Sequence, residues 1–322
     1  MGLLTLESGL LDRGGMAVIE INKELFTHMG INEEYSETIN RPSMTYWQDA
    51  WRRLKKNKIA MAGIVVLTVF TLMAVIGPYM VKFTYNSTNL ELLNQSPNKV
   101  HWFGTDSLGR DLWARVWMGA RVSLFIGLAA AGIESLVGII VGGVSGYLGG
   151  KADMFIMRFV DIMIAIPELI FIILIMVVVG SGIMPIIIAF AITGWLRMAR
   201  LVRGQVLQLK EQEFVLAAKT LGASSQRLVF RHLIPNTLGV IIVTLTMAVP
   251  NAIFYEAFLS FIGIGVRPPL ASWGQLANTG AQVFEIYPFE LFIPAVFISL
   301  TMLSLNLLGD GLRDALDPRL RK

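Results

Sequence analysis

Four acidic residues lie within or at the edge of long apolar runs, where a carboxylate could hold a proton, a cation or the charged end of a cargo. They are Glu134, Asp161, Glu168 and Glu256. An ionised carboxylate at the centre of a bilayer costs roughly 2.5–3.5 kcal/mol on insertion scales, so each needs a compensating role. The acids either line a polar path or form hydrogen bonds between helices, and for Glu134 and Glu168 we favour the second role.

The surroundings of these acids suggest partners for them. Glu134 precedes Gly138 by four residues and should therefore face the interior of a helix bundle. Arg158 and Asp161 have the i, i+3 spacing of an ion pair on one helix face. Glu168 directly follows a proline, which frees a backbone carbonyl.

Ser145 is the candidate nucleophile, because Gly143-Val144-Ser145-Gly146 has the GxSG pattern that is typical of rhomboid-like intramembrane proteases. A serine nucleophile needs a base within hydrogen-bonding reach. The three histidines, His28, His101 and His232, all lie outside the apolar runs. Glycines four residues apart instead predict a smooth face for close helix packing, namely Gly138, Gly142, Gly146 and Gly150.

Residues Ser145 to Ala152 also come nearest to a phosphate-binding loop. The motif's first glycine is replaced by Ser145, and the hydroxyl that would bind magnesium is replaced by Ala152. The sequence has no cysteine, which excludes disulfides and cysteine-ligated zinc. We therefore expect no catalytic, cofactor or metal site in this chain.

Composition places the chain among membrane proteins. Of its 322 residues, 54% are hydrophobic and only 16% are charged, against about 25% charged in a typical soluble domain. The net charge is +4, but the basic residues lie at the ends of apolar runs. Such a distribution reports membrane topology rather than binding to nucleic acid.

Six apolar stretches predict transmembrane helices, because about 20 apolar residues cross a bilayer core. They are Ile59–Val81, Val122–Leu148, Ile162–Val179, Gly182–Leu196, Thr237–Tyr255 and Leu291–Leu308. The glycines of Gly180-Ser181-Gly182 permit a tight turn between the third and fourth stretches.

The distribution of lysine and arginine predicts that both termini lie in the cytosol. With that orientation, 18 of these residues fall in cytosolic segments and six in external ones. Residues 1–40 contain no hydrophobic region of a signal peptide, so we expect residues 1–45 to form a cytosolic tail.

Residues 46–58 are predicted to form an amphipathic helix at the membrane interface. Trp47, Trp51 and Leu54 recur at i, i+4 and i+7 and are interspersed with basic residues. A simple cytosolic extension of the first membrane helix fits the pattern equally well.

A charged segment, 197–236, is the longest predicted cytosolic loop. Within it Phe214, Ala217, Ala218 and Leu221 share one small, apolar helix face. Gly222 is a natural C-cap, Ser224 or Ser225 could open a second helix, and Pro235 would close that helix before the fifth span. The apolar face either packs on its own bundle or docks a partner protein.

This loop resembles the EAA motif of ATP-binding-cassette (ABC) importer permeases. Ala217, Ala218, Gly222 and Pro235 match the motif in spacing, whereas Leu216 stands where the motif has a glutamate. Glu213, three residues earlier, is the candidate replacement. The resemblance implies that residues 213–236 couple the membrane bundle to an ATPase.

Further segments resemble oligopeptide and dipeptide permease subunits of the OppC/DppC type, and the resemblance covers roughly residues 45–322. They are His101–Asp111, Gly119–Leu124, Glu256–Gly265, Pro268-Pro269, Ser272–Gly274 and Gly309–Pro318. The resemblance implies an all-α integral membrane protein with six transmembrane helices of the MetI-like type, in which residues 59–322 form the permease domain.

The same resemblance implies an oligopeptide importer that works by alternating access. Its partners would be a second homologous permease subunit, two ATPase subunits that hydrolyse ATP, and an extracytoplasmic peptide-binding protein. The alternatives are a dipeptide or nickel-chelate importer of the same family, or a proton-coupled secondary transporter. A secondary transporter would need buried acids but no cytosolic docking helix.

Overall fold

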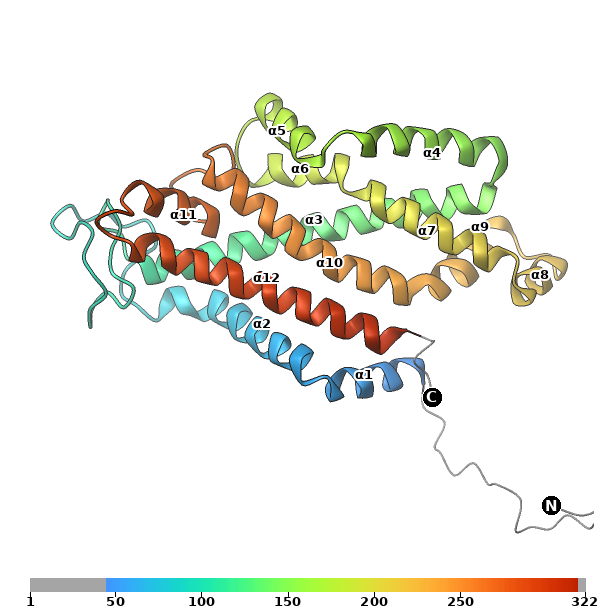
Figure 1. The fold of residues 1–322 in the computed structure, drawn as a ribbon, viewed down its shortest axis with the longest axis horizontal. Coiled ribbons are helices and arrows are strands. Elements are labelled where there is room, and N and C mark those ends of the chain that lie inside the picture. The colour runs from blue at the N-terminus through green and yellow to red at the C-terminus, as the bar shows by residue number, and fades with distance from the viewer. Residues whose placement is uncertain (1–44, 318–322) are drawn as a thin grey trace, which may run out of the picture. The chain divides into compact units, whose positions relative to one another are not determined.

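The computed structural model describes residues 45–317, and the ordered elements in that range are helices. The predicted tail before Thr45 and the end of the C-terminal motif at Pro318 lie outside the described residues. Long helices lie side by side along the bundle, with α8 and α11 at opposite ends (Figure 1). The central helix α3 contacts both α7 and α10, and α12 contacts α2 and α10.

The helices have the following bounds. They are α1 (Tyr46–Lys56), α2 (Lys58–Ile76), α3 (Leu112–Leu148), α4 (Gly150–Ala165), α5 (Glu168–Val179), α6 (Ile183–Thr193), α7 (Trp195–Lys210), α8 (Glu213–Thr220), α9 (Ser225–Arg227), α10 (Ile234–Phe261), α11 (Trp273–Gln282) and α12 (Phe289–Leu316). A 3₁₀ turn, Gly77–Tyr79, extends α2, and a π-helical segment, Leu228–Leu233, joins α9 to α10.

The predicted all-α membrane fold is confirmed. In the described residues five helical segments are long and apolar enough to cross a membrane, and α4 with α5 makes a sixth if that bent pair is one span. The structure departs from the predicted path of the chain at three points, namely within the third span, after the fourth span and at Pro235.

The third span is not one straight helix. α4 and α5 meet at an angle of 85°. Pro167 disfavours helical backbone at the residue before it, and Ile166 is extended, with φ −89° and ψ 129°. The break makes Glu168 the first residue of α5.

The fourth span continues beyond the predicted boundary at Leu196. α6 and α7 together run from Ile183 to Lys210, so the residues expected to begin a loop are helical. Arg197, Arg200 and Arg203 therefore project from a helix, where they can reach acids on neighbouring elements.

Pro235 does not end the second cytosolic helix. The helical path runs unbroken from Ser225 to Phe261, and Pro235 lies in the first turn of α10. In a regular α-helix the proline ring collides with the carbonyl four residues earlier. The wider π turn that precedes Pro235 removes the regular i→i−4 pairing there and so accommodates the ring.

Glycines bring α3 and α7 into close contact, as their spacing predicted. A Cβ at Gly138 would lie 2.5 Å from the Cβ of Met198, and one at Gly146 would lie 2.9 Å from the carbonyl oxygen of Arg203. Gly142 packs against the backbone of Ala199 in the same way. Gly150 does not belong to this face, since it begins α4 with a φ of +56°.

α1 is a separate helix, because Asn57 breaks the path with extended backbone and caps α2 through its side chain. Leu54 is buried against Ala315 of α12, and the Tyr46 hydroxyl donates to the Leu316 carbonyl over 3.2 Å. Trp47 and Trp51 are exposed. The interfacial position of their indoles stays a prediction, whereas Leu54 faces the bundle.

Candidate functional site

Ser145, the candidate nucleophile, has a structural partner. Its hydroxyl donates to Asp153 Oδ1 over 2.6 Å, and Arg203 Nη2 donates to the other oxygen of Asp153 over 2.6 Å. Asp153 therefore joins α3, α4 and α7 at one point. A carboxylate that is held by an arginine cannot serve readily as a general base, so the geometry offers no activated serine.

We expect Ser145→Ala to retain full transport and to lower the free energy of unfolding by about 1 kcal/mol, the value of one hydrogen bond. Asp153→Ala should cost more, because it leaves the Arg203 guanidinium without its partner. Thermal unfolding of the purified variants together with uptake assays would measure both effects. Loss of transport in a normally folded Ser145→Ala protein would contradict a purely structural role for the hydroxyl.

The segment His101–Asp111 is a buried polar network before α3. His101 Nδ1 lies 2.8 Å from Asp111 Oδ2, and Arg110 Nε donates to Asp106 Oδ2 over 2.8 Å. Arg115 Nη2 reaches across to Gln275 Oε1 of α11 at 2.9 Å. These contacts assign the motif a structural role, namely fixing the loop before α3 to α11.

Glu256 is fully buried and anchors the opposite side of the same region. Its carboxylate accepts hydrogen bonds from the hydroxyls of Ser123, at 2.7 Å, and Ser260, at 2.8 Å. Ser123 Oγ in turn accepts from the backbone of Trp273. Of the two roles left open for Glu256, the geometry supports helix–helix hydrogen bonding.

The predicted pair between Arg158 and Asp161 is wrong. Asp161 accepts instead from Arg200 Nη2 of α7 at 2.6 Å. The continuation of the fourth span as a helix carries Arg200 to this position, which a loop at residue 197 would not have done.

Glu134 and Glu168 line one cavity of about 220 Å³ among α3, α5, α6, α7 and α10. Arg197 Nη2 lies 3.2 Å from Glu168 Oε2. The polar lining of the cavity comprises Glu134, Ser135, Glu168, Arg197, Thr244, Asn251 and Tyr255. The bundle interior therefore holds a polar cavity, a feature that a transporter uses and a purely structural bundle does not need.

The cytosolic helix α8 has one face on the bundle and one free face. Val215 and Ala218 pack in a cluster with residues of α7 and the π-helical segment. Phe214, Ala217 and Leu221 point outward, as does Leu216. Ala218, which the sequence placed on one face with Phe214, Ala217 and Leu221, is half-buried and packs beside Val215 on the bundle.

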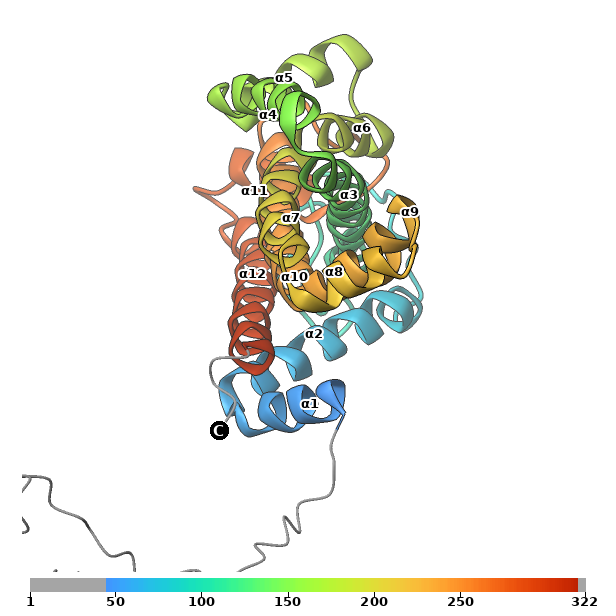
Figure 2. The same cartoon turned by 90° about the vertical axis from the view of Figure 1, so that its right-hand side faces the viewer.

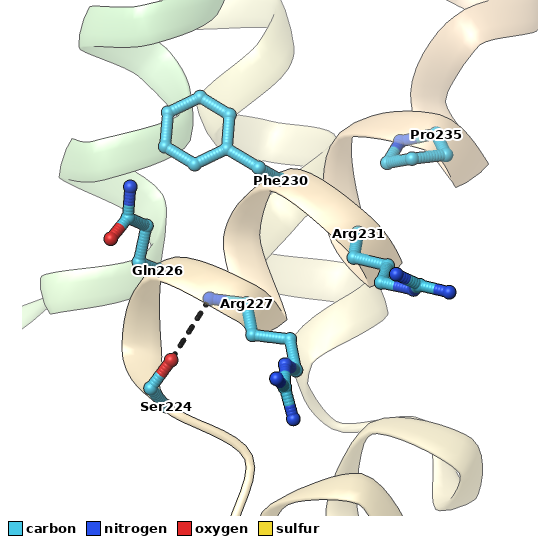
Figure 3. A pocket seen from close by; sticks show the side chains of 6 residues that line it. All are labelled: Ser224, Gln226, Arg227, Phe230, Arg231 and Pro235. Carbon is cyan, nitrogen blue, oxygen red and sulfur yellow. Dashed lines mark hydrogen bonds between the residues drawn. The ribbon is translucent and has the colours of Figure 1, made fainter.

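The free face of α8, which we define as Phe214, Leu216, Ala217 and Leu221, lies near an open depression of about 530 Å³ that the sequence did not indicate. The depression is lined by Ser224, Gln226, Arg227, Phe230, Arg231 and Pro235 (Figure 3). Figure 2 looks onto this end of the bundle, where α8 and α9 lie across the ends of α7 and α10. Exposed apolar residues at the end of a membrane bundle, beside arginines, are typical of a protein interface.

Residues 136–322 match the family described as the binding-protein-dependent transport system inner membrane component. The chain belongs to this family. Residues 45–97 also match the N-terminal transmembrane domain of oligopeptide transport permease C. The permease family supports the transporter interpretation and gives no support to a proton-coupled secondary transporter.

Two curated relatives cover nearly the whole permease. The oligopeptide transport system permease protein OppC of Bacillus subtilis is 51% identical over 94% of this chain and 99% of its own. The dipeptide transport system permease protein DppC of the same organism is 52% identical over 89% of this chain and 90% of its own. The resemblance to OppC/DppC-type subunits is thereby confirmed.

The fold is also similar to a chain of the inward-facing MetNI methionine ABC transporter. The TM-score is 0.50, with 17% sequence identity, and the match covers 62% of the permease and 97% of that chain. The match confirms the MetI-like fold. The helices that are long and apolar enough to cross a membrane, together with the family, make the permease a multi-pass inner membrane protein.

Proposed function

We propose that the permease is one of two homologous membrane subunits of an ATP-driven importer for oligopeptides. The observation that carries this proposal is the match over nearly the whole chain to permease proteins of oligopeptide and dipeptide transport systems. The two proteins together would enclose the translocation path. The test is uptake of defined peptides by cells in which the permease gene is deleted and then restored.

The proposed partners follow from the family's dependence on a binding protein and from the free surface at one end of the bundle. An extracytoplasmic binding protein would deliver the peptide at the α11 end. Two ATPase subunits would bind at the α8 end and hydrolyse ATP. Both termini would then be cytoplasmic, in agreement with the positive charge of the segments at that end.

Coupling to the ATPase is proposed to run through the free face of α8. Leu221 exposes 88% of its surface and Phe214 exposes 43%. A partner that covers these two side chains gains the free energy of removing them from water. Glu213 is exposed in the first turn of α8 and is proposed to take the place of the missing motif glutamate at Leu216.

Leu221→Glu is expected to reduce co-purification of the ATPase subunits at least tenfold, because a buried, unpaired carboxylate at an interface costs more than about 1.4 kcal/mol. The amount of permease in the membrane should not change, since Leu221 packs on nothing in the bundle. Gln208→Glu is the matched control, because Gln208 is exposed on α7 and the change adds the same charge outside the free face of α8. Equal ATPase recovery from both variants would contradict the assignment of this face.

Alternating access would then connect the two ends of the bundle. Closure of the ATPases would move α8, and α8 would pull on α7 and the π-helical segment, with which it shares the cluster around Val215. α7 carries Arg197 into the polar cavity, so motion of α8 has a direct mechanical route to Glu134 and Glu168. We propose that these two acids lie on the translocation path, whereas Asp161 and Glu256 hold helices together.

A further inference from the structure

One break of the helical path and one proline inside a helix lie at the polar cavity. Glu168 follows the break at Pro167, and Asn251 follows Pro250 inside α10. Irregular backbone at membrane depth is tolerated where it is buried in protein or lines a water-filled cavity. In transport proteins broken membrane helices are also where substrates bind. The break beside Glu168 is therefore in keeping with a binding site at this cavity.

The two acids in the cavity differ in their partners. Glu168 is paired with Arg197, as the distance of 3.2 Å shows. Glu134 exposes only 9% of its surface, and none of the hydrogen bonds or ion pairs among residues 45–317 involves its carboxylate. Its carboxyl group lies against Gly194, at the junction of α6 and α7, where even a Cβ atom would collide with it. The cavity therefore holds one carboxyl group without a hydrogen-bond or ion-pair partner among the described residues.

A second polar group beside Glu134 is also unpartnered. Ser135 exposes 3% of its surface, and its hydroxyl has no hydrogen-bond partner among the described residues. Buried polar groups are nearly always paired, by protein, water or ligand. Glu134 and Ser135 line the same cavity side by side, so the two groups can contact one ligand.

The chemistry of the lining selects a cation with several hydrogen-bond donors. A primary ammonium group has one positive charge and three N–H donors. Glu134 supplies the opposite charge, while the Ser135 hydroxyl and the side-chain carbonyl of Asn251 can accept further hydrogen bonds. Tyr255 and Phe190 pack against each other with ring centroids 6.1 Å apart and give the cavity an aromatic wall, which also favours a cation.

The size of the cavity fits an end group rather than a whole peptide. Its volume of about 220 Å³ corresponds to roughly seven water molecules at about 30 Å³ each. Arg197 and Asn251 at its edge are exposed, so the cavity is open to the surface of the chain. A peptide could place its first residue inside while the rest of the chain stays in the path.

We propose that the cavity binds the terminal ammonium group of the transported peptide through Glu134, with Ser135 and Asn251 as further acceptors. The proposal rests on the proposed function as a peptide permease. The ion pair between Glu168 and Arg197 occupies the second carboxylate of the cavity, so that Glu134 is the carboxyl group left to meet a single ammonium group.

The test measures equilibrium binding of radiolabelled trialanine to the complete importer in lipid nanodiscs, with the permease either unchanged or carrying Glu134→Gln. Glutamine keeps the size of the side chain but removes its charge. We expect binding about tenfold weaker in the variant, the effect of losing a charge-assisted hydrogen bond. Asp161→Asn is the matched control, since it removes a carboxylate from α4 outside the cavity, and it should bind trialanine as the unchanged protein does.

Unlabelled competitors identify the group that is bound. N-acetyl-trialanine has no ammonium group and should compete at least tenfold less well than trialanine with the unchanged protein. N-acetyl-alanyl-alanyl-lysine carries its only ammonium group on the side chain. Effective competition by this peptide extends the site to lysine side chains, and failure to compete confines it to the amino terminus.

The proposal would be overturned if the unchanged protein and Glu134→Gln bound trialanine equally well. It would also be overturned if Glu134→Gln and Asp161→Asn lost trialanine binding to the same extent. A third contrary result would be transport of trialanine by the unchanged complex without detectable binding. Failure of the proposed function has a different signature, because the unchanged importer would then neither bind nor take up any of the three peptides.

Discussion

Replacing Gly222 with proline is expected to abolish both ATPase assembly and transport while the permease still inserts into the membrane. Gly222 has a φ of +83°, and its N–H donates to the Lys219 carbonyl over 3.0 Å. The N–H of Ala223 reaches back to the Ala218 carbonyl, which completes a Schellman cap at the end of α8. Proline fixes φ near −65° and has no N–H, so the cap cannot form.

Loss of this cap changes the direction in which the chain leaves α8. The cap sets how the free face, with Phe214 and Leu221, is presented beside the depression of α9 and the π-helical segment. The membrane helices do not depend on it, because Gly222 is exposed and nothing in the described chain lies within 4 Å of an added Cβ. Insertion should therefore be unchanged, as a membrane-fraction immunoblot would measure.

Gly222→Asn is the matched control for this variant. Asparagine keeps the N–H and tolerates the left-handed backbone better than most residues, so ATPase recovery and uptake should stay within about twofold of the unchanged protein. Gly222→Ala should be intermediate, because a Cβ at positive φ costs roughly 1–2 kcal/mol. Normal uptake by Gly222→Pro would rule out coupling through α8.

The sequence predicted those parts of the fold that depend on local pattern. Apolar runs located the membrane helices, and the glycine spacing in α3 predicted a face for close helix packing, which the structure places against α7. Arg197, which the sequence marks as the end of a span, lies on a helix that continues to Lys210 and pairs with Glu168 of another element. Local rules could not supply that long-range partner.

The sequence predicted the two acids of the polar cavity but not that they share a cavity. Glu134 and Glu168 could be singled out as acids in apolar runs, and Pro167 beside Glu168 was a visible signal of a broken helix. Their shared cavity depends on the packing of α3 against the junction at Gly194, which is 60 residues away in the chain. Sequence periodicity describes one helix face at a time and carries no information on which faces meet.

The continuation of the helix through Pro235 was not predicted from the sequence. A proline after a short amphipathic helix normally ends the helix. Here the π turn at Leu228–Leu233 absorbs Pro235, and the continuous helix carries Phe230 and Arg231 to the surface. His232 and Asn236, which flank Pro235, give no local sequence signal that would predict a π turn.

Gly142→Ala is expected to prevent accumulation of the permease in the membrane. A single methyl group at this position would overlap the backbone carbonyl of Ala199, and backbone cannot move aside as a flexible side chain can. α3 and α7 would have to separate along their whole contact, including the ion pair of Asp153 with Arg203. Overpacking of this kind costs about 1–3 kcal/mol, which is a large fraction of the total stability of a typical protein.

Gly132→Ala in the same helix is the matched control, because an added Cβ there meets nothing within 4 Å among the described residues. Alanine has a higher helix propensity than glycine by about 1 kcal/mol in water, so Gly132→Ala should accumulate at least as well as the unchanged protein. The measurement is the amount of folded permease after extraction in mild detergent and size-exclusion chromatography. Equal yields from the two alanine variants would contradict the close packing of α3 on α7. The mechanical route from α8 through α7 to the polar cavity would then lose its rigid support.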